Sequence, residues 1–249
     1  MFFVEPPRSP WDINVILFRI PVRITPYFWI FGLFLFGINS PTPGALLAAM
    51  VALLLSILIH ELGHAAAFRS YGHYPVITLY AMGGLTSPGP RAFGIRNAGF
   101  AGRVFITAAG PGAQLLAAAL VYQGFKLAGY HVGCQWGLPH VVSLGVDLFR
   151  VNATFNSFVN AFLFFSVFWA ILNLLPVFPL DGGQIAREVL LQMNPREGLR
   201  QSLVLSVLVA GLVAVAALVQ WRDWFMAALF AFLAYSNYVE LASDRRGPW

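Results

Sequence analysis

Charged side chains are scarce in this chain of 249 residues: Asp, Glu, Lys and Arg together make up 10%. An ordinary globular domain carries about 25% charged residues, so this sequence has too few to cover a water-exposed surface. Hydrophobic residues make up 59% instead, and the mean hydropathy is +0.73. The composition therefore excludes an ordinary water-soluble protein and predicts an integral membrane protein surrounded by the lipid bilayer.

Cysteine and lysine are almost absent. Cys134 is the only cysteine, which excludes an intrachain disulfide and a cysteine-based zinc site. The basic residues, almost all arginine, form no block, and they lie at the edges of apolar runs, where they suit lipid headgroups. We therefore expect no nucleic-acid binding, although the formal net charge is +5.

Six apolar segments are candidate membrane spans, each of which needs about 20 residues. They cover residues 24–39, 44–69, 102–129, 156–177, 202–221 and 223–241. The first is short and contains Pro26, and the last two are separated only by Arg222-Asp223, which predicts a tight hairpin. The Gly110-Pro111-Gly112 stretch in the third would kink a helix or let a neighbour approach closely.

Two linkers interrupt the apolar segments. Residues 70–101 combine glycines and prolines with the β-favouring run Val76 to Tyr80, which indicates a short β-hairpin or extended loop. Residues 130–155 form the second linker. The expected fold class is an all-α polytopic membrane protein, with about six transmembrane helices and a small β-hairpin between the second and third. We expect residues 1–249 to form a single domain.

Basic residues are distributed unevenly between the two sets of loops. One set contains Lys126, Arg150 and Arg222. The other contains twelve arginines: Arg8, Arg19, Arg23, Arg69, Arg91, Arg96, Arg103, Arg187, Arg196, Arg200, Arg245 and Arg246. Because cytoplasmic loops carry the excess of basic residues, we expect a multi-pass protein of the cell membrane with both termini in the cytoplasm.

The central polar pattern, His60-Glu61-Leu62-Gly63-His64, lies inside the second apolar segment. Residues four apart share one face of a helix, so the two imidazoles could bind one Zn²⁺. Glu61 could reach a water at that metal and is suited to the general base. Ionisable groups inside an apolar span are costly and usually functional. The alternative is a polar helix-packing cluster without metal.

A catalytic zinc site normally has three protein ligands, so a third must come from elsewhere. Asp181 is the best candidate. Pro176 and Pro179 break the helix of the fourth span at its cytoplasmic end, which places Asp181 on the same side of the membrane as His60 and His64. The alternative is that Asp181 caps a helix over 182–192. The remaining candidates are interpreted as interfacial or solvated side chains: His73, His131, His140, Glu188 and Glu197.

Two motifs closely resemble those of the site-2 protease family, polytopic intramembrane zinc proteases that cut transmembrane segments of other proteins. They are His60-Glu61-Leu62-Gly63-His64 and Asn173-Leu174-Leu175-Pro176 running to Pro179-Leu180-Asp181-Gly182-Gly183. The Ala109 to Ala113 stretch and the Gly83-Gly84 turn look like further family elements. The resemblance covers about residues 20–190, whereas the additional hairpin of about 202–241 carries no recognised motif. With no room for the PDZ domain of many members, the chain looks like a minimal form.

The resemblance implies one Zn²⁺ per chain, held by His60, His64 and Asp181, with Glu61 as the catalytic residue. It also implies that the substrates are single-span membrane proteins. The sequence indicates neither the identity of these substrates nor the oligomeric state of the chain. By the same resemblance, Asn173 would lie near the substrate or the developing oxyanion. The alternative is that the Asn173 side chain simply forms a hydrogen bond with a neighbouring helix.

Gly83 and Gly84 could hold an unwound substrate as an added strand. Two other classes of function compete with the protease. A metal transporter is disfavoured because the chain has no inverted repeat and no second polar span. A proteolytically silent relative is disfavoured because the four motif residues are all present.

Overall fold

The computed structural model describes residues 6–37, 42–81, 83–89, 98–136, 142–148 and 152–244. The chain forms two compact units. The first comprises Met1–Asn97, Ala109–Trp136 and Val142–Ala170, and the second comprises Ala98–Ala108, Gly137–Val141 and Ile171–Trp249. The single domain expected for residues 1–249 stays a prediction.

Within the described residues, five helices are long and apolar enough to cross a membrane, which agrees with a multi-pass integral membrane protein. They are α2 (Pro43–Ser70), α3 (Phe100–Leu127), α4 (Ala153–Asn173), α6 (Gly198–Ala216) with the π-helical turn η1 (Ala217–Trp221), and α7 (Trp224–Asp244). The first expected span is instead the short apolar helix α1 (Pro26–Phe36). Its 11 residues are fewer than a perpendicular crossing needs, and residues 38–39 lie outside the described chain.

The N-termini of α1 and α2 follow the same local rule. Each helix begins with a proline, Pro26 or Pro43, whose missing N–H is not needed in the first turn. In α2 the hydroxyl of Thr42 also accepts a hydrogen bond of 3.1 Å from the backbone N–H of Ala45. This cap fixes the start of the long helix that carries His60 and His64.

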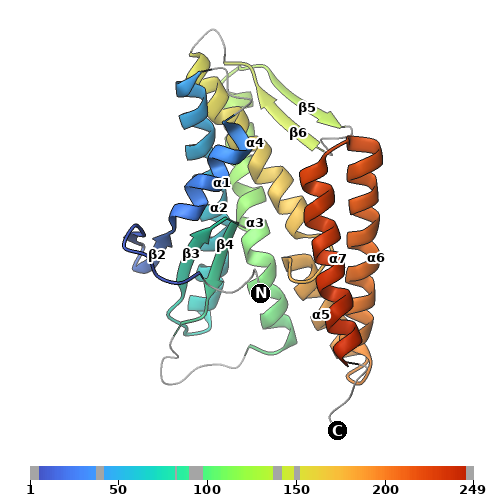
Figure 1. Cartoon of the computed structure of the whole chain (residues 1–249). Coiled ribbons are helices and arrows are strands. Elements are labelled where there is room, and N and C mark those ends of the chain that lie inside the picture. The colour runs from blue at the N-terminus through green and yellow to red at the C-terminus, as the bar shows by residue number, and fades with distance from the viewer. Residues whose placement is uncertain are drawn as a thin grey trace. The chain divides into compact units, whose positions relative to one another are not determined.

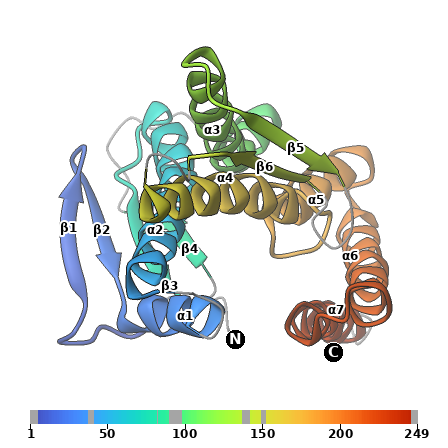
Figure 2. The same ribbon diagram turned by 90° about the horizontal axis from the view of Figure 1, so that it is seen from above.

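The expected hairpin between the second and third spans is confirmed, and it is part of a larger sheet (Figure 1). Strand β3 (Val76–Tyr80) pairs antiparallel with β4 (Gly83–Ser87). A second hairpin, β1 (Ile13–Leu17) and β2 (Ile20–Ile24), was not predicted, and it gives the strand order β1-β2-β3-β4. Figure 2 shows β1 and β2 running side by side.

Strands β2 and β3 are parallel, with Val22 opposite Ile77. A parallel pair needs a crossover connection, and here the connection contains both α1 and α2. Apolar side chains of the sheet, including Val22, Ile77 and Leu79, share one buried core with Leu53 and Ile57 of α2. The sheet is therefore packed directly on the helix that carries the candidate metal ligands.

The second linker contains a two-stranded hairpin, β5 (Val132–Trp136) and β6 (Val142–Val146). Two asparagines of α4 hold the end of β6 and the residues that follow. Asn160 accepts from the N–H of Val146 at 2.8 Å and donates to its carbonyl at 2.9 Å, and Asn156 accepts from the N–H of Leu148.

The second unit contains α5 (Asp181–Met193) and the additional hairpin, whose helices α6 and α7 lie side by side in both views (Figures 1 and 2). The tight connection expected at Arg222-Asp223 is present. Arg222 adopts a left-handed conformation with φ 53°, and Asp223 caps α7 through a 3.0 Å hydrogen bond from the N–H of Met226.

Candidate metal centre

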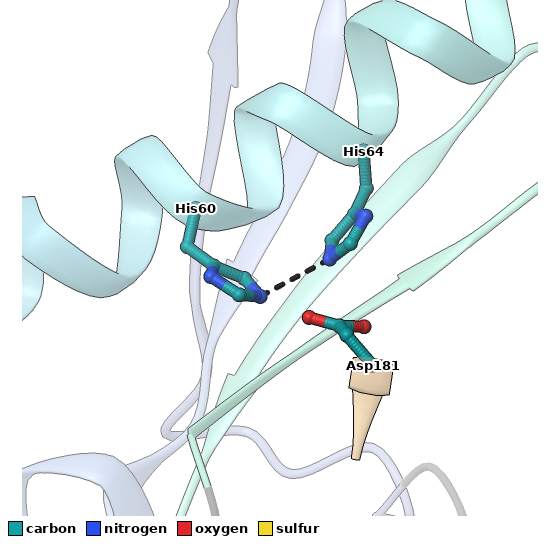
Figure 3. Close-up of side chains that lie close together, drawn as sticks. All are labelled: His60, His64 and Asp181. Atoms are coloured by element: carbon teal, nitrogen blue, oxygen red, sulfur yellow. Dashed lines mark hydrogen bonds between the residues drawn. The ribbon is translucent and has the colours of Figure 1, made fainter. Parts of the chain in front are cut away.

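Two buried histidines face one another from successive turns of α2. Nε2 of His60 lies 3.1 Å from Nε2 of His64 (Figure 3). The two residues are 4% and 8% exposed, respectively. At this distance, at most one hydrogen atom fits between the two ring nitrogens. The spacing of four residues thus places two potential donors of nitrogen lone pairs on one face of the helix.

A buried hydrogen-bond chain fixes the ring of His60 from behind. The amide oxygen of Gln114 lies 3.0 Å from Nδ1 of His60, and the Gln114 amide nitrogen donates to Ser56 Oγ at 2.8 Å. The hydroxyl of Ser166 donates to the same Ser56 oxygen at 3.1 Å. Since the amide oxygen only accepts, the hydrogen of a neutral His60 lies on Nδ1 and the lone pair on Nε2.

Small residues let α3 approach the histidines closely. Gly110 lies against the His64 ring and Gly63 lies against the backbone of Ala109, and neither glycine has room for a Cβ atom. The close approach expected at Gly110-Pro111-Gly112 is therefore confirmed at Gly110, whereas a Cβ atom on Gly112 would meet nothing within 4 Å. Close helix contacts through glycine and alanine are typical of membrane proteins.

The side chain of Glu61, a residue of α2, is held against strand β4. The hydroxyl of Thr86 donates to Oε2 of Glu61 at 2.6 Å, and the Glu61 side chain lies against Gly84 without room for a Cβ atom. Burial, with the nearby Glu61 carboxylate as second cause, raises the pKa of Tyr80 to about 12. Gly83 adopts φ +113° and lies against the ring of Trp169.

Asp181 is the first residue of α5, and it is buried. The helix cap is Leu180, which makes no side-chain capping hydrogen bond, so Asp181 does not occupy the capping position considered above. Gly182 and Gly183 follow, and both lie against backbone atoms of residues 174–178 without room for a Cβ atom. The glycines of the Leu-Asp-Gly-Gly sequence therefore allow the preceding loop to fold back onto the start of the helix.

His60, His64 and Asp181 form a group that could hold a metal ion (Figure 3). Each offers one ligand atom, and these atoms lie within 4.8 Å of one another. No other group of three or more His, Cys, Asp or Glu in the part of the chain that the structure describes has this property. Two imidazoles and one carboxylate are a donor set of catalytic zinc sites, so the residues present fit a zinc ion.

The structure also describes most of the other residues considered from the sequence. Asn173 is the last residue of α4 and is half-buried. Glu188 forms an ion pair of 2.7 Å with Arg103, and the ring of His73 packs edge-on against Phe68. His131 is exposed and Glu197 lies 3.7 Å from Arg200, while His140 lies outside the described residues.

Sequence reasoning missed Gln114, Ser56, Ser166 and Thr86. Gln114 carried a usable signal, because a glutamine in an apolar span is costly and usually has a partner. The serines and Thr86 carried none, because small hydroxyl residues occur in apolar helices and strands for many reasons.

Comparison with known proteins is consistent with this geometry. The family model described as peptidase family M50 matches residues 48–219. Among solved structures, the site-2 protease from Methanocaldococcus jannaschii has a similar fold, with a TM-score of 0.57 and 18% sequence identity over 93% of this chain and 95% of that chain. No curated protein matches.

Proposed function

The chain belongs to peptidase family M50, and from this premise we propose that it is a zinc-dependent intramembrane endopeptidase. It would hydrolyse peptide bonds in or near the transmembrane segments of other proteins. The observation that carries the proposal is the buried group of His60, His64 and Asp181, with Glu61, also buried, directly after His60 in the sequence. A polar packing cluster would need no such set of three ligand atoms.

In this proposal His60 Nε2, His64 Nε2 and a carboxylate oxygen of Asp181 hold one zinc ion per chain. A zinc ion, when bound, supplies Lewis acidity that activates a water molecule and polarises the scissile carbonyl. Gln114 keeps the hydrogen of His60 on Nδ1 and so keeps Nε2 available as a donor of its lone pair. Burial of all three side chains excludes bulk water from the site.

Glu61 moves the proton. Thr86 donates a hydrogen bond to Oε2 of the carboxylate, and the carboxylate would accept a proton from the attacking water. The same carboxylate then donates that proton to the nitrogen of the leaving amine, which balances the hydrolysis. The fixed position of Glu61 between α2 and Gly84 supports this role, because a general base must be held within reach of its proton.

We also propose that an unwound substrate segment pairs with the outer edge of β4. Among the described strands, β4 pairs only with β3, so its other edge offers backbone hydrogen-bonding groups beside Glu61. Gly83 and Gly84 lie in this strand. Asn173, eight residues before Asp181, would donate a hydrogen bond to the developing oxyanion.

Substrates in this proposal are single-span membrane proteins, since a buried site at a membrane helix suits a segment delivered from the bilayer. This proposal counts α1 as the first of six crossings, so both termini would lie in the cytoplasm and the chain in the cell membrane, as the excess of arginine supports. Of these arginines, Arg91, Arg96, Arg245 and Arg246 lie outside the described residues, as does Arg150 of the opposite set. Labelling of cysteines introduced near each terminus with a membrane-impermeant reagent tests the orientation.

A Glu61→Gln variant separates the three classes of function. In lipid nanodiscs, the variant should keep about one zinc per chain and lose cleavage of a fluorogenic single-span model substrate, whereas Asp181→Ala should lose both. Cleavage by Glu61→Gln at the original rate would overturn the mechanism. If the unmodified chain binds zinc but cleaves no member of a panel of single-span proteins, the result would favour the proteolytically silent relative. Zinc transport in sealed vesicles that survives Glu61→Gln would favour the transporter.

A further inference from the structure

Two polar side chains of the additional hairpin hold one residue of the loop before Asp181. The backbone N–H of Phe178 donates to Ser206 Oγ of α6 at 2.9 Å. Its carbonyl accepts a hydrogen bond of 2.7 Å from the amide nitrogen of Asn237 of α7. Both side chains are 1% exposed, so water does not compete for these bonds.

Each of these side chains is also anchored to its own helix. The hydroxyl of Ser206 donates to the carbonyl of Ser202 at 2.8 Å, and the second amide hydrogen of Asn237 goes to the carbonyl of Leu233 at 2.8 Å. Each side chain therefore bridges a rigid helix to Phe178 in a defined rotamer. Polar residues buried in apolar spans are costly and are usually kept for a purpose.

The loop needs these partners because its backbone is not helical. Residues 174–180 connect α4 to α5, and non-helical backbone at membrane depth must find hydrogen bonds within the protein. Pro179 cannot donate any. Ser206 and Asn237 supply partners for both backbone polar groups of Phe178, so the hairpin satisfies the backbone of the loop at this residue.

The position of Phe178 is transmitted to Asp181 by close packing. Gly183 lies against the backbone of Val177 and Phe178, and Gly182 lies against the carbonyls of Leu174 and Leu175. No space remains for the loop to slide over the first turn of α5.

The ring of Phe178 is also held from α5. The guanidinium of Arg187 lies 3.6 Å from the ring centroid and is 3.3 Å from the carboxylate of Glu240 in α7. This arrangement ties α5, the loop and the hairpin into one unit.

We infer that Ser206 and Asn237 are positioning residues that hold the Phe178 loop so that Asp181 presents its carboxylate to the metal. The hairpin of α6 and α7 is then part of the metal centre, although it contributes no ligand. This inference rests on the proposed role of Asp181 as a zinc ligand.

Zinc affinity of the full-length protein in nanodiscs tests the inference. Chelator competition gives the dissociation constant, and the absorption spectrum of bound Co²⁺ reports the ligand geometry. We expect Ser206→Ala and Asn237→Leu each to weaken zinc binding by about tenfold and the double variant by about 100-fold, the range seen when outer partners of metal ligands are removed. The Co²⁺ spectrum of the double variant should change as well.

Ser202→Ala is the matched control, because Ser202 is equally buried in α6 but its hydroxyl bonds only to Leu199 of the same helix. Its zinc affinity should stay within about twofold of the unmodified chain, since its backbone carbonyl still accepts from Ser206. Ser206→Thr keeps the hydroxyl and should restore the affinity lost in Ser206→Ala. If Asn237→Leu does not fold, the Ala and Thr variants of Ser206 decide the question.

The outcomes separate this inference from the proposed function. Equal zinc affinity of Ser206→Ala and the unmodified chain would overturn the inference and leave the metal site intact. A loss of zinc affinity in Ser202→Ala as large as that in Ser206→Ala would also overturn it. Removing the hydroxyl of any buried serine in α6 would then weaken zinc binding, whether or not the serine contacts Phe178. If the unmodified chain binds no zinc, or Asp181→Ala binds it as tightly, the proposed function itself fails.

Discussion

The amide oxygen of Gln114 lies 3.0 Å from Nδ1 of His60. Replacing Gln114 with leucine removes the acceptor that fixes the hydrogen on Nδ1, and it leaves buried Ser56 without its amide donor. We expect zinc affinity to fall about 10–100-fold, as for other outer partners of histidine ligands. Chelator competition measures the change.

Gln123→Leu is the control for this prediction, because Gln123 is exposed on the same helix. It should bind zinc like the unmodified chain. An unchanged dissociation constant for Gln114→Leu would mean that the ring of His60 is held by other contacts.

Gly110→Ala should abolish stoichiometric zinc binding, because its Cβ atom would occupy the space of the His64 ring. The neighbouring Gly112→Ala is a stringent control, since a Cβ atom there meets nothing within 4 Å. Alanine favours a helix over glycine by about 1 kcal/mol at either position, so helix propensity cannot explain a loss at Gly110 alone. Zinc content measured by mass spectrometry of both variants decides the matter, and equal content would refute the close packing.

Gly84→Ala should separate metal binding from catalysis. The new methyl group would displace the Glu61 carboxylate, since the three atoms nearest to it all belong to the Glu61 side chain. We expect zinc content to stay at about one per chain and the cleavage rate to fall about 100-fold or more, the usual contribution of a general base. Gly124→Ala, at an open position of α3, should cleave normally. Full activity of Gly84→Ala would argue against the proposed place of Glu61.

Thr86→Val removes the hydroxyl that bonds to Oε2 of Glu61 and keeps the shape of the side chain. Because hydrogen bonds to charged groups contribute about 1.5–3 kcal/mol, kcat/KM for the model substrate should fall about tenfold or more. Thr86→Ser retains the hydroxyl and should recover most of the rate. If valine and serine behave alike, the hydroxyl has no part in holding the carboxylate.

Local sequence pattern was sufficient for the histidine pair and for most of the helices. His60 and His64 are one helical turn apart whatever the rest of the fold, and long apolar runs form membrane helices because their backbone must bond internally. Asp181 needed more than a local pattern, since its neighbours Pro179 and Gly182 indicate only a broken helix. The family resemblance supplied its expected role.

Most of the features that sequence reasoning missed depend on contacts between distant segments. Strand β2 pairs with the adjacent β1 and also with β3, which follows only after two helices, so the four-stranded sheet that contains residues 20–24 could not be identified from neighbouring residues alone. Likewise, the bonds that join Ser56 to Gln114 and Ser166 connect three helices. Hydrophobic periodicity within one helix carries no information about such partners.

The parallel pairing of β2 with β3 also sets an order of events during synthesis. Strand β2 leaves the ribosome before α2, and its open edge has no partner until α2 has been made and Val76 to Tyr80 follow. The histidine helix is therefore synthesised before Thr86 and Gly84 exist to cover Glu61. A truncated nascent chain that stops before Gly83 would contain both imidazoles but would lack the strand that restrains the carboxylate, so the general base is secured only after the whole of the histidine helix has been made.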